Sequence, residues 1–385
     1  MVDYFNLDEL ISEEHKIIRN SAKEWVNRRV KPVIDEYSHR HEYPEHLMKE
    51  MGELGFLGPF ILEEYGGSGL DMISYGIIMQ ELEAGDSSIR SSASVQSSLV
   101  MYPIYYFGTE EQKRKYLPKL ASGEFVGCFG LTEPNHGSDP GGMECKLTKQ
   151  GGNYILNGAK MWITNSPIAD IAIVWAKDDE GIIKGIIVEK DFKGFSAPEI
   201  SKKWSLRASL TGELVFDNVI VPEENILPGI KGLKGPMMCL NSARYGIAWG
   251  AIGAAIDCYS SALEYSLQRK QFNVPIASFQ FQQKKLAEML TEITKAQLLA
   301  WRLGVLKNED KASPGQISMA KRNNVKMALD IARESRQMLG AMGITGDFPM
   351  MRHMMNLESV ITYEGTHDIH LLITGMDITG ISAFK

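Results

Sequence analysis

Apolar residues recur at helical spacing along the first part of the chain. Four of them share one face of a predicted helix: Ile11, Ile18, Ala22 and Trp25. Thr109 and Gln112 have the spacing of a capping box, which predicts a helix that begins there and ends at Pro118. Residues 1–124 are therefore predicted to form an N-terminal helical domain.

The periodicity changes at about residue 125. Short β-prone runs then alternate with turn dipeptides, and no helix-length period survives as far as about residue 233. Gly151-Gly152 and Asn157-Gly158 flank the apolar run 154–156, which predicts a β-hairpin. Further candidate strands cover 171–175, 182–188 and 213–221. Residues 125–235 are predicted to form a β domain.

Helical spacing returns after Pro236. A continuous apolar stripe contains Leu286, Met289, Leu290, Ile293, Ala296, Ala300 and Leu303. Ser313, Pro314 and Gln316 then supply an N-cap, a first-turn proline and a capping-box glutamine, and Gly340 marks the expected end of that helix. Residues 236–385 are predicted to be helical, which gives three domains in the order helical, β, helical.

Composition limits the class of protein. A net charge of −7 supplies no basic field for phosphate backbones and argues against a nucleic-acid partner. The cysteines are scattered without a pairing pattern, which indicates a reducing compartment. The longest apolar run, 246–256, is too short to span a membrane, and the first residues resemble neither a secretory signal nor a transit peptide. We therefore expect a protein without a membrane span, located in the cytoplasm of a bacterium or archaeon, or in the mitochondrial matrix as a mature eukaryotic chain.

Several common catalytic signatures do not occur in the sequence. It contains neither a dinucleotide-binding G-x-G-x-x-G, nor a P-loop, nor a G-x-S-x-G elbow. His39, His41 and His46 lie in a predicted polar loop, where solvated histidines are the simpler interpretation. His367 and His370 are three residues apart on a predicted helix, but no third ligand follows at matching spacing. We expect no bound metal.

One carboxylate near the C-terminus has the setting of a general base. Glu364 stands between the apolar run 360–363 and a helix that Thr366 is predicted to cap, with Asp368 in its first turn. Apolar surroundings disfavour a carboxylate, so we expect its pKa to lie above the usual ~4.3, as a base acting on a carbon acid requires. A capping or ion-paired glutamate is the alternative, and this segment alone favours that alternative.

Two further segments combine glycines, hydroxyls and an aromatic side chain. Segment 129–139 contains Thr132 and Ser138 in a turn whose amides and hydroxyls can cradle a phosphate or a polar ring edge. Segment 162–166 places Trp162 and Thr164 at strand spacing. Each segment by itself is more typical of ordinary β-turns.

Taken together, these segments resemble the acyl-CoA dehydrogenase family. The matching motifs, in order, are Thr132-Glu133-Pro134 with Gly137-Ser138-Asp139, Trp162-Ile163-Thr164-Asn165, Arg269-x-Gln271-Phe272 and Tyr363-Glu364-Gly365-Thr366. The resemblance covers essentially the whole chain. It implies a mainly α fold with a central β-barrel-like domain and a C-terminal four-helix bundle. Asn273 departs from the glycine usual in the family, which puts that turn in doubt.

The resemblance implies that FAD and an acyl-CoA thioester share one site. Glu364 would remove the α-proton while the β-hydrogen leaves as hydride to the flavin. Residues implied at the flavin are Phe129, Leu131, Thr132, Ser138, Trp162, Ile163, Thr164, Thr366 and Phe384. Arg269, Gln280 and the turn Gln337, Met338, Leu339 and Gly340 would reach it from a neighbouring subunit of a homotetramer, with Phe272 and Ala341 beside them. Residues implied at the acyl-CoA are Ser138, Leu240, Asn241, Arg244, Tyr363 and Gly365. An electron-transferring flavoprotein would accept the electrons.

Within the family, segments 90–99, 128–135 and 356–358 resemble the glutaryl-CoA dehydrogenases. A dicarboxylic substrate brings a second negative charge into an apolar pocket, where an arginine can pair with it. Arg90 matches that arginine, with Ser94 as a second donor and Ser91 beside it; a solvated arginine is the alternative. Glu83 and Tyr363 match residues of the type that decarboxylates its product to crotonyl-CoA. A non-decarboxylating enzyme and a short-chain monocarboxylic acyl-CoA dehydrogenase stay open, as do a non-catalytic helical scaffold and a histidine-metal protein outside the family.

Overall fold

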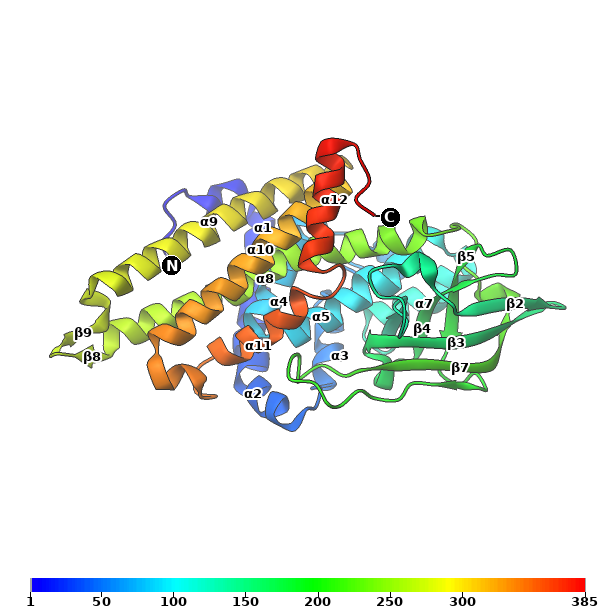
Figure 1. Cartoon of the computed structure of the whole chain (residues 1–385), viewed down its shortest axis with the longest axis horizontal. Coiled ribbons are helices and arrows are strands. Elements are labelled where there is room, and N and C mark those ends of the chain that lie inside the picture. Colours follow the sequence, from blue (N-terminus) through cyan, green and yellow to red (C-terminus); the bar gives the residue numbers. More distant parts are fainter. Residues whose placement is uncertain (1, 385) are drawn as a thin grey trace.

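The computed structural model describes residues 2–384 and places a β-sheet region between two helical regions in the chain (Figure 1). The N-terminal helices are α1 (Glu13–Trp25), α2 (Lys31–Arg40), α3 (His46–Glu53), α4 (Met72–Gly85), α5 (Ser87–Ser94), α6 (Tyr102–Phe107) and α7 (Glu110–Ala121). The C-terminal helices are α8 (Lys234–Gln268), α9 (Gln280–Asn308), α10 (Pro314–Met338), α11 (Met350–Val360) and α12 (His367–Thr379). The predicted order of helical, β, helical is confirmed.

Local signals decide where the helices start. The capping box of α7 is present: Gln112 N donates to Thr109 Oγ1 at 3.2 Å, and Thr109 N donates to Gln112 Oε1 at 2.9 Å. Ser313 and Gln316 form the same pair of bonds at the start of α10. The predicted end of α7 at Pro118 is wrong, because a proline in the last turns removes a single backbone bond and the helix continues to Ala121.

The middle region is a mixed sheet. Its strands are β1 (Gly127–Gly130), β2 (Lys146–Gln150), β3 (Asn153–Thr164), β4 (Ile171–Lys177), β5 (Ile183–Glu189), β6 (Phe195–Ser196) and β7 (Thr211–Pro222). They are ordered β1-β4-β2-β3-β7-β6, with β5 paired to β4. The hairpin at Gly151-Gly152 is confirmed. Asn157-Gly158 is not a turn but a bulge inside β3, where Gly158 has a φ of +131°.

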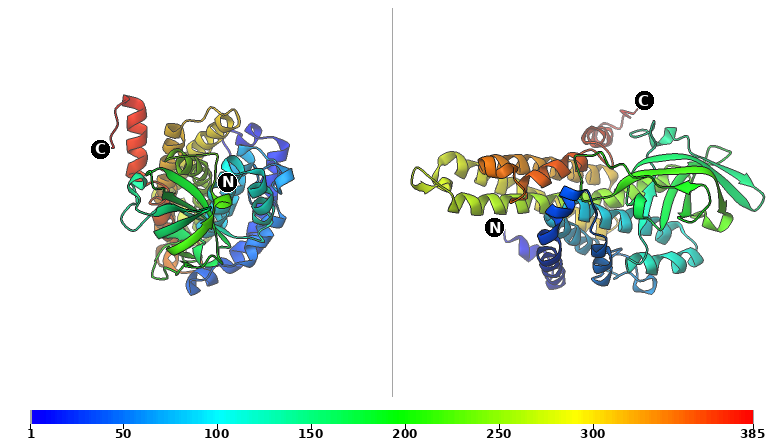
Figure 2. Two further views of the ribbon diagram at one scale, coloured as in Figure 1. Left: turned by 90° about the vertical axis from the view of Figure 1, so that its right-hand side faces the viewer. Right: turned by 90° about the horizontal axis from the view of Figure 1, so that it is seen from below.

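The N-terminal and C-terminal helices share one hydrophobic core. α4 is buried on nearly all sides and packs against α8, so residues such as Ile78 and Ile252 belong to the same cluster. The two backbones almost touch, since a Cβ on Gly253 would lie 1.8 Å from Gln80 O. A second cluster joins the helices around Leu117 to Trp175 on the sheet. The views in Figure 2 show the sheet region at one end of this helical body.

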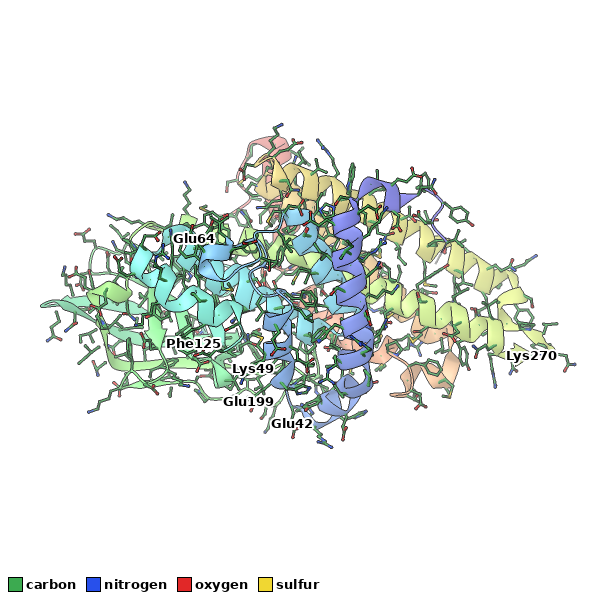
Figure 3. All side chains as sticks on the ribbon, turned by 180° about the vertical axis from the view of Figure 1, so that it is seen from behind. Glu42, Lys49, Glu64, Phe125, Glu199 and Lys270 are labelled. Atoms are coloured by element: carbon green, nitrogen blue, oxygen red, sulfur yellow. The ribbon has the colours of Figure 1, made fainter. Side chains whose placement is uncertain are left out.

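The hairpin of β8 (Lys270–Gln271) and β9 (Val274–Pro275) forms the tip at the other end. Figure 3 labels Lys270 at this tip and Phe125, just before the sheet, in the other half of the molecule. Phe272 and Asn273 form the hairpin turn with φ values of +49° and +63°. Asparagine tolerates this left-handed conformation better than most residues, which explains how the chain makes the turn without the expected glycine. Within residues 2–384, no helix is long and apolar enough to cross a membrane.

Candidate active site

Glu364 lies in a tight turn between α11 and α12. Its φ is +52°, which is uncommon for a residue other than glycine, and Gly365 follows with a φ of +97°. A Cβ on Gly365 would lie 2.9 Å from His370 Nε2, so a glycine is required there. Thr366 caps α12 as predicted, because its Oγ1 accepts from Ile369 N at 3.2 Å.

Cationic side chains hold the carbonyls of this turn. Arg244, on α8, donates from Nε to the carbonyl oxygen of Glu364 at 2.7 Å. Lys321, on α10, donates from Nζ to the carbonyl oxygens of Tyr363 and Gly365, the latter at 2.7 Å. Three consecutive carbonyls are therefore fixed by charged donors. Arg244, which the family resemblance places at CoA, also donates from Nη1 to Asn241 Oδ1 at 3.2 Å.

The carboxyl group of Glu364 is suited to accept a proton. Burial raises its pKa above the usual value, while the positive charges of Lys321, Arg90 and Arg244 oppose that rise. Its Oε2 is buried and has no hydrogen-bond partner within the described part of the chain. A carboxylate with a raised pKa and a free oxygen is the arrangement that proton abstraction from carbon requires.

A buried cluster around Arg90 lies beside this turn. Arg90 is 0% exposed and donates from Nε to Glu83 Oε2 at 2.6 Å; Nη2 donates to the hydroxyl of Tyr363, the residue before the base. Its Nη1 is buried without a partner among residues 2–384. The interpretation of Arg90 as a solvated surface residue is therefore wrong. One nitrogen of a buried guanidinium is left to bind a further group.

Helix α5 is polar in sequence and yet buried along its whole length. Buried hydroxyls require partners, and two in α5 have them: Ser87 Oγ donates to Glu83 Oε1 at 2.8 Å, and Ser92 Oγ donates to Asn165 Oδ1 at 3.1 Å. Ser94 Oγ is buried with no partner in the described residues, and Ser91 is 2% exposed. A buried polar wall with unsatisfied donors on Arg90 and Ser94 is typical of a ligand-binding site.

The sheet contributes a second wall. Met161 N donates to Thr132 O at 2.9 Å, which ties the Thr132 segment to a bulge where Trp162 has a φ of +63° and remains 57% exposed. Lys160 anchors the same segment, because its Nζ donates to Glu133 Oε1 at 2.7 Å and to Leu131 O at 3.2 Å. The bulge presents an open indole face next to a threonine.

The other residues that the resemblance places at the flavin differ in how far their side chains are exposed. Phe129, Leu131 and Ile163 have side chains within the core, at 8%, 5% and 3% exposure, so Trp162 is better placed than Phe129 or Leu131 to pack on a planar ligand. Thr164 and Thr366 are half-buried, Ser138 is exposed, and Phe384 is 42% exposed near the C-terminus. Leu240, on α8, is 9% exposed.

A further group of predicted flavin contacts lies far from Glu364 within this chain. Arg269 and Phe272 are at the β8–β9 tip, with Gln280 at the adjoining start of α9 (Figure 1). Gln337 is exposed in the last turn of α10, and Gly340 and Ala341 are exposed just after that helix, whereas Met338 and Leu339 are buried. A single chain does not bring these residues together with Trp162 or Glu364.

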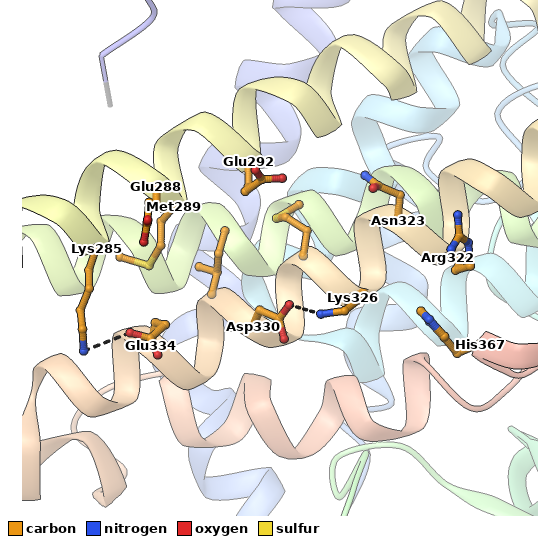
Figure 4. A pocket seen from close by; sticks show the side chains of 12 residues that line it. Lys285, Glu288, Met289, Glu292, Arg322, Asn323, Lys326, Asp330, Glu334 and His367 are labelled. Carbon is orange, nitrogen blue, oxygen red and sulfur yellow. Dashed lines mark hydrogen bonds and ion pairs between the residues drawn. The ribbon is translucent and has the colours of Figure 1, made fainter. Parts of the chain in front are cut away.

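The two histidines near the base do not converge. His370 is 1% exposed beside Gly365, and burial together with Lys321 and Arg244 lowers its pKa to about 2. His367 lines a separate groove of about 380 Å³ between α9 and α10, with Arg322 and Lys326 (Figure 4). No group of three His, Cys, Asp or Glu side chains that could hold a metal occurs within residues 2–384.

Comparison with known proteins shows where this arrangement belongs. Residues 12–124 match the N-terminal domain of acyl-CoA dehydrogenases, 128–219 the middle domain and 231–379 the C-terminal domain. The glutaryl-CoA dehydrogenase of Desulfococcus multivorans is 34% identical over 97% of this chain and 99% of its own. The chain belongs to the acyl-CoA dehydrogenase family. It is thus an oxidoreductase of that family, as the resemblance predicted.

Members with different substrates are comparably similar to this acyl-CoA dehydrogenase. A short-chain specific acyl-CoA dehydrogenase of Megasphaera elsdenii is 37% identical over 96% of this chain and 98% of its own. A crystal structure of a glutaryl-CoA dehydrogenase from Mycobacterium smegmatis, in complex with FADH2, is 47% identical with a TM-score of 0.97 and covers 99% of this chain and 98% of that one. Sequence identity alone therefore does not fix the substrate.

The sheet of this acyl-CoA dehydrogenase carries side chains of the kinds that a flavin requires. Trp162 is 57% exposed on a bulge of β3, Thr164 in the same strand is half-buried, and so is Thr132, whose segment is tied to the bulge. Stacking on an aromatic face and hydrogen bonds to a polar ring edge are what an isoalloxazine needs from a protein. The predicted flavin site thus has both kinds of group.

Sequence reasoning missed Lys321 and Lys160. Lys321 occupies the buried stripe of α10 with Ile317, Asn324 and Ala328, and it is 1% exposed. A lysine on an otherwise apolar helical stripe is the signal that could have revealed it, because lysine is almost never fully buried unless it has partners. Lys160 lies inside a β-strand and gave no comparable signal before its pairing with Glu133 was known.

Proposed function

We propose that this protein is an FAD-dependent glutaryl-CoA dehydrogenase that also decarboxylates its product to crotonyl-CoA. The observation that carries the proposal is the buried guanidinium of Arg90, with Nη1 unpartnered in the described chain and bonded through Nη2 to the residue beside Glu364. A purely hydrocarbon acyl chain has no hydrogen-bond acceptor for the unpartnered nitrogen of this arginine. That nitrogen provides a partner for a second carboxylate.

The oxidation is a matched loss of a proton and a hydride. Glu364 takes the α-proton of the thioester, and its turn is held rigid by Arg244 and Lys321. FAD, when bound, supplies the acceptor for the β-hydride. Burial makes the carboxylate of Glu364 more basic than an exposed glutamate, which favours its role as a proton acceptor.

Decarboxylation then follows from the position of the distal carboxylate. Loss of CO₂ from the unsaturated intermediate leaves a dienolate, and the protonated Glu364 returns its proton to give crotonyl-CoA. The charge of Arg90 is already balanced by Glu83 at 2.6 Å. A substrate carboxylate therefore contacts a nearly neutral pair rather than a full positive charge, so the loss of its negative charge carries a smaller electrostatic penalty.

Product analysis with glutaryl-CoA and an artificial electron acceptor tests this proposal. Crotonyl-CoA and CO₂ support decarboxylation, while glutaconyl-CoA identifies a non-decarboxylating enzyme. Protein that releases no flavin on denaturation contradicts the whole proposal. Glu364→Gln is expected to lower kcat by at least about 10³-fold, because the amide cannot accept the proton; unaltered turnover would remove the base assignment alone.

Arg90→Met tests substrate choice. The useful quantity is the ratio of kcat/KM for glutaryl-CoA to kcat/KM for butyryl-CoA in one preparation, because it does not depend on the fraction of active protein. Loss of a charged hydrogen bond should reduce this ratio by about 10- to 100-fold. Combining it with Glu83→Gln avoids leaving a buried unpaired carboxylate, and Arg29→Met, exposed and paired with Glu50, is the charge control. A ratio that does not change would favour the short-chain monocarboxylic alternative.

We also propose a homotetramer that passes electrons to an electron-transferring flavoprotein. The support is the exposed set at the β8–β9 tip and the end of α10. Figure 1 shows β8 and β9 at the opposite end of the molecule from β3, the strand that contains Trp162, so they do not reach a flavin at β3 of the same chain. Light scattering of the holoprotein should give four chains per particle. Arg269→Ala should then weaken flavin binding without changing the ratio of kcat/KM for glutaryl-CoA to kcat/KM for butyryl-CoA.

A further inference from the structure

Lys321 is a buried lysine that binds backbone rather than a carboxylate. It lies on α10, is 1% exposed, and donates to the carbonyl oxygens of Tyr363 and Gly365. These are the residues immediately before and after Glu364. The ammonium therefore spans the turn that presents the proposed base, and it does so from a helix separate from that turn.

The turn needs such a restraint. Glu364 and Gly365 both have left-handed backbone conformations, and three successive carbonyls point away from any helix or sheet partner. Left-handed conformations at residues other than glycine persist only where surrounding contacts enforce them. Arg244 fixes the middle carbonyl, and Lys321 fixes the two outer ones.

We propose that Lys321 is a positioning residue, which fixes the direction of the Glu364 side chain and keeps a positive charge beside its carboxylate. This inference rests on the proposed function, in which Glu364 is the base. The ammonium form of lysine is a strongly hydrated point charge, and burial lowers the pKa of Lys321 to about 7, so placing it in the core is costly without a specific use. Here its use is local, because its ammonium donates to the carbonyl oxygens on both sides of the base.

Other charged and titratable groups face the same carboxylate. Arg90 on α5 is balanced by Glu83 of α4, Arg244 of α8 is engaged with the carbonyl of Glu364, and His370 of α12 is neutral. Tyr363 and Tyr75 add uncharged hydroxyls. Among the positive charges around Glu364, Lys321 has the largest effect in lowering its pKa, with Arg90 and Arg244 following.

Two substitutions separate its two roles in the holoenzyme. Lys321→Gln keeps N–H donors for both carbonyls but removes the charge. We expect the acid limb of its kcat/KM profile to move upward by on the order of one pH unit, with kcat at the new optimum retained within about threefold. Lys321→Met removes both donors, and its kcat should fall by about 10- to 100-fold while KM changes by less than about threefold.

Lys326→Met is the matched control, since Lys326 is on the same helix, exposed and paired with Asp330. This substitution should leave both kcat and the acid limb of the kcat/KM profile unchanged. If the neutral variants do not yield folded holoenzyme, Lys321→Arg keeps the cation and must keep the acid limb within about 0.3 pH unit of wild type. The inference is overturned if the acid limb of the kcat/KM profile moves in Lys321→Arg. It is also overturned if that limb does not move in Lys321→Gln.

Failure of the proposed function gives a different pattern. If Glu364→Gln retains turnover, the base assignment is lost and the acid limb has another origin. If Glu364→Gln is inactive and the Lys321 variants match wild type in pH profile and kcat, only the positioning role is wrong.

Discussion

Gly250 leaves the space in which the Arg90–Glu83 pair is buried. It lies within α8, and a Cβ there would fall 2.1 Å from Glu83 Oε2 and 3.1 Å from Arg90 Nε. Both partners are 0% exposed, so neither can swing into solvent. Gly250→Ala therefore adds one methyl group next to the Arg90–Glu83 cluster, which we propose selects the substrate.

Its magnitude follows from three opposing effects. The carboxylate must retreat by about 1 Å to reach ordinary contact, which stretches its 2.6 Å bond to Arg90 beyond hydrogen-bonding length. Separating a buried ion pair costs about 3–5 kcal/mol, and an extra methyl in a packed core costs about 1–3 kcal/mol if the backbones shift instead. Replacing a helical glycine by alanine returns about 1 kcal/mol. The expected net loss in free energy of unfolding is about 2–4 kcal/mol if the ion pair separates, and about 0–2 kcal/mol if the backbones shift instead.

Urea unfolding of the holoprotein and the substrate ratio together measure this effect. The urea concentration at the unfolding midpoint should fall. The ratio of kcat/KM for glutaryl-CoA to kcat/KM for butyryl-CoA should drop by about tenfold, because the guanidinium of Arg90 moves. Gly375→Ala in α12 is the control: a Cβ there meets nothing within 4 Å, so stability should rise slightly. A Gly250→Ala variant with wild-type midpoint and wild-type ratio would show that Glu83 and Arg90 do not act as a fixed unit.

Two further predictions concern buried charges outside this cluster. Lys160→Met leaves Glu133 without its ion-pair partner in the sheet and should lower the free energy of unfolding by about 3–5 kcal/mol. On unfolding, this variant should lose bound flavin before it loses the helical circular-dichroism signal. The control Lys146→Met, at an exposed lysine, should change neither the free energy of unfolding nor the order of these two losses. Asp86 caps α5 and pairs with Arg352; burial raises its pKa, but Arg352, His353 and Ser88 outweigh that effect and hold it below the usual value of 3.8. Its carboxylate thus stabilises the fold fully above that pH and loses this contribution as the pH falls through the lowered pKa. Asp86→Asn should reduce the free energy of unfolding at pH 7 by about 3–5 kcal/mol, with a smaller difference in acid; equal urea midpoints at pH 7 would contradict this.

The sequence by itself determined most of the helices and strands and their order. Capping boxes at Thr109 and Ser313 act within one helical turn, so local spacing was sufficient to place α7 and α10. The β-prone runs 171–175 and 182–188 likewise predicted β4 and β5. Pro118 and Asn157-Gly158 misled the prediction because neighbouring packing and strand pairing overrode their local preferences.

Only the tertiary structure decided which charges are buried together. Arg90, Glu83 and Tyr363 come from three elements, and Lys321 reaches the Glu364 turn from 42 residues before Tyr363. Desolvation depends on what covers a side chain on every side, and that is a property of the packed fold rather than of local spacing. For the same reason, the sequence favoured an ordinary capping glutamate at position 364, and the folded chain shows a carboxyl group whose pKa is raised by burial.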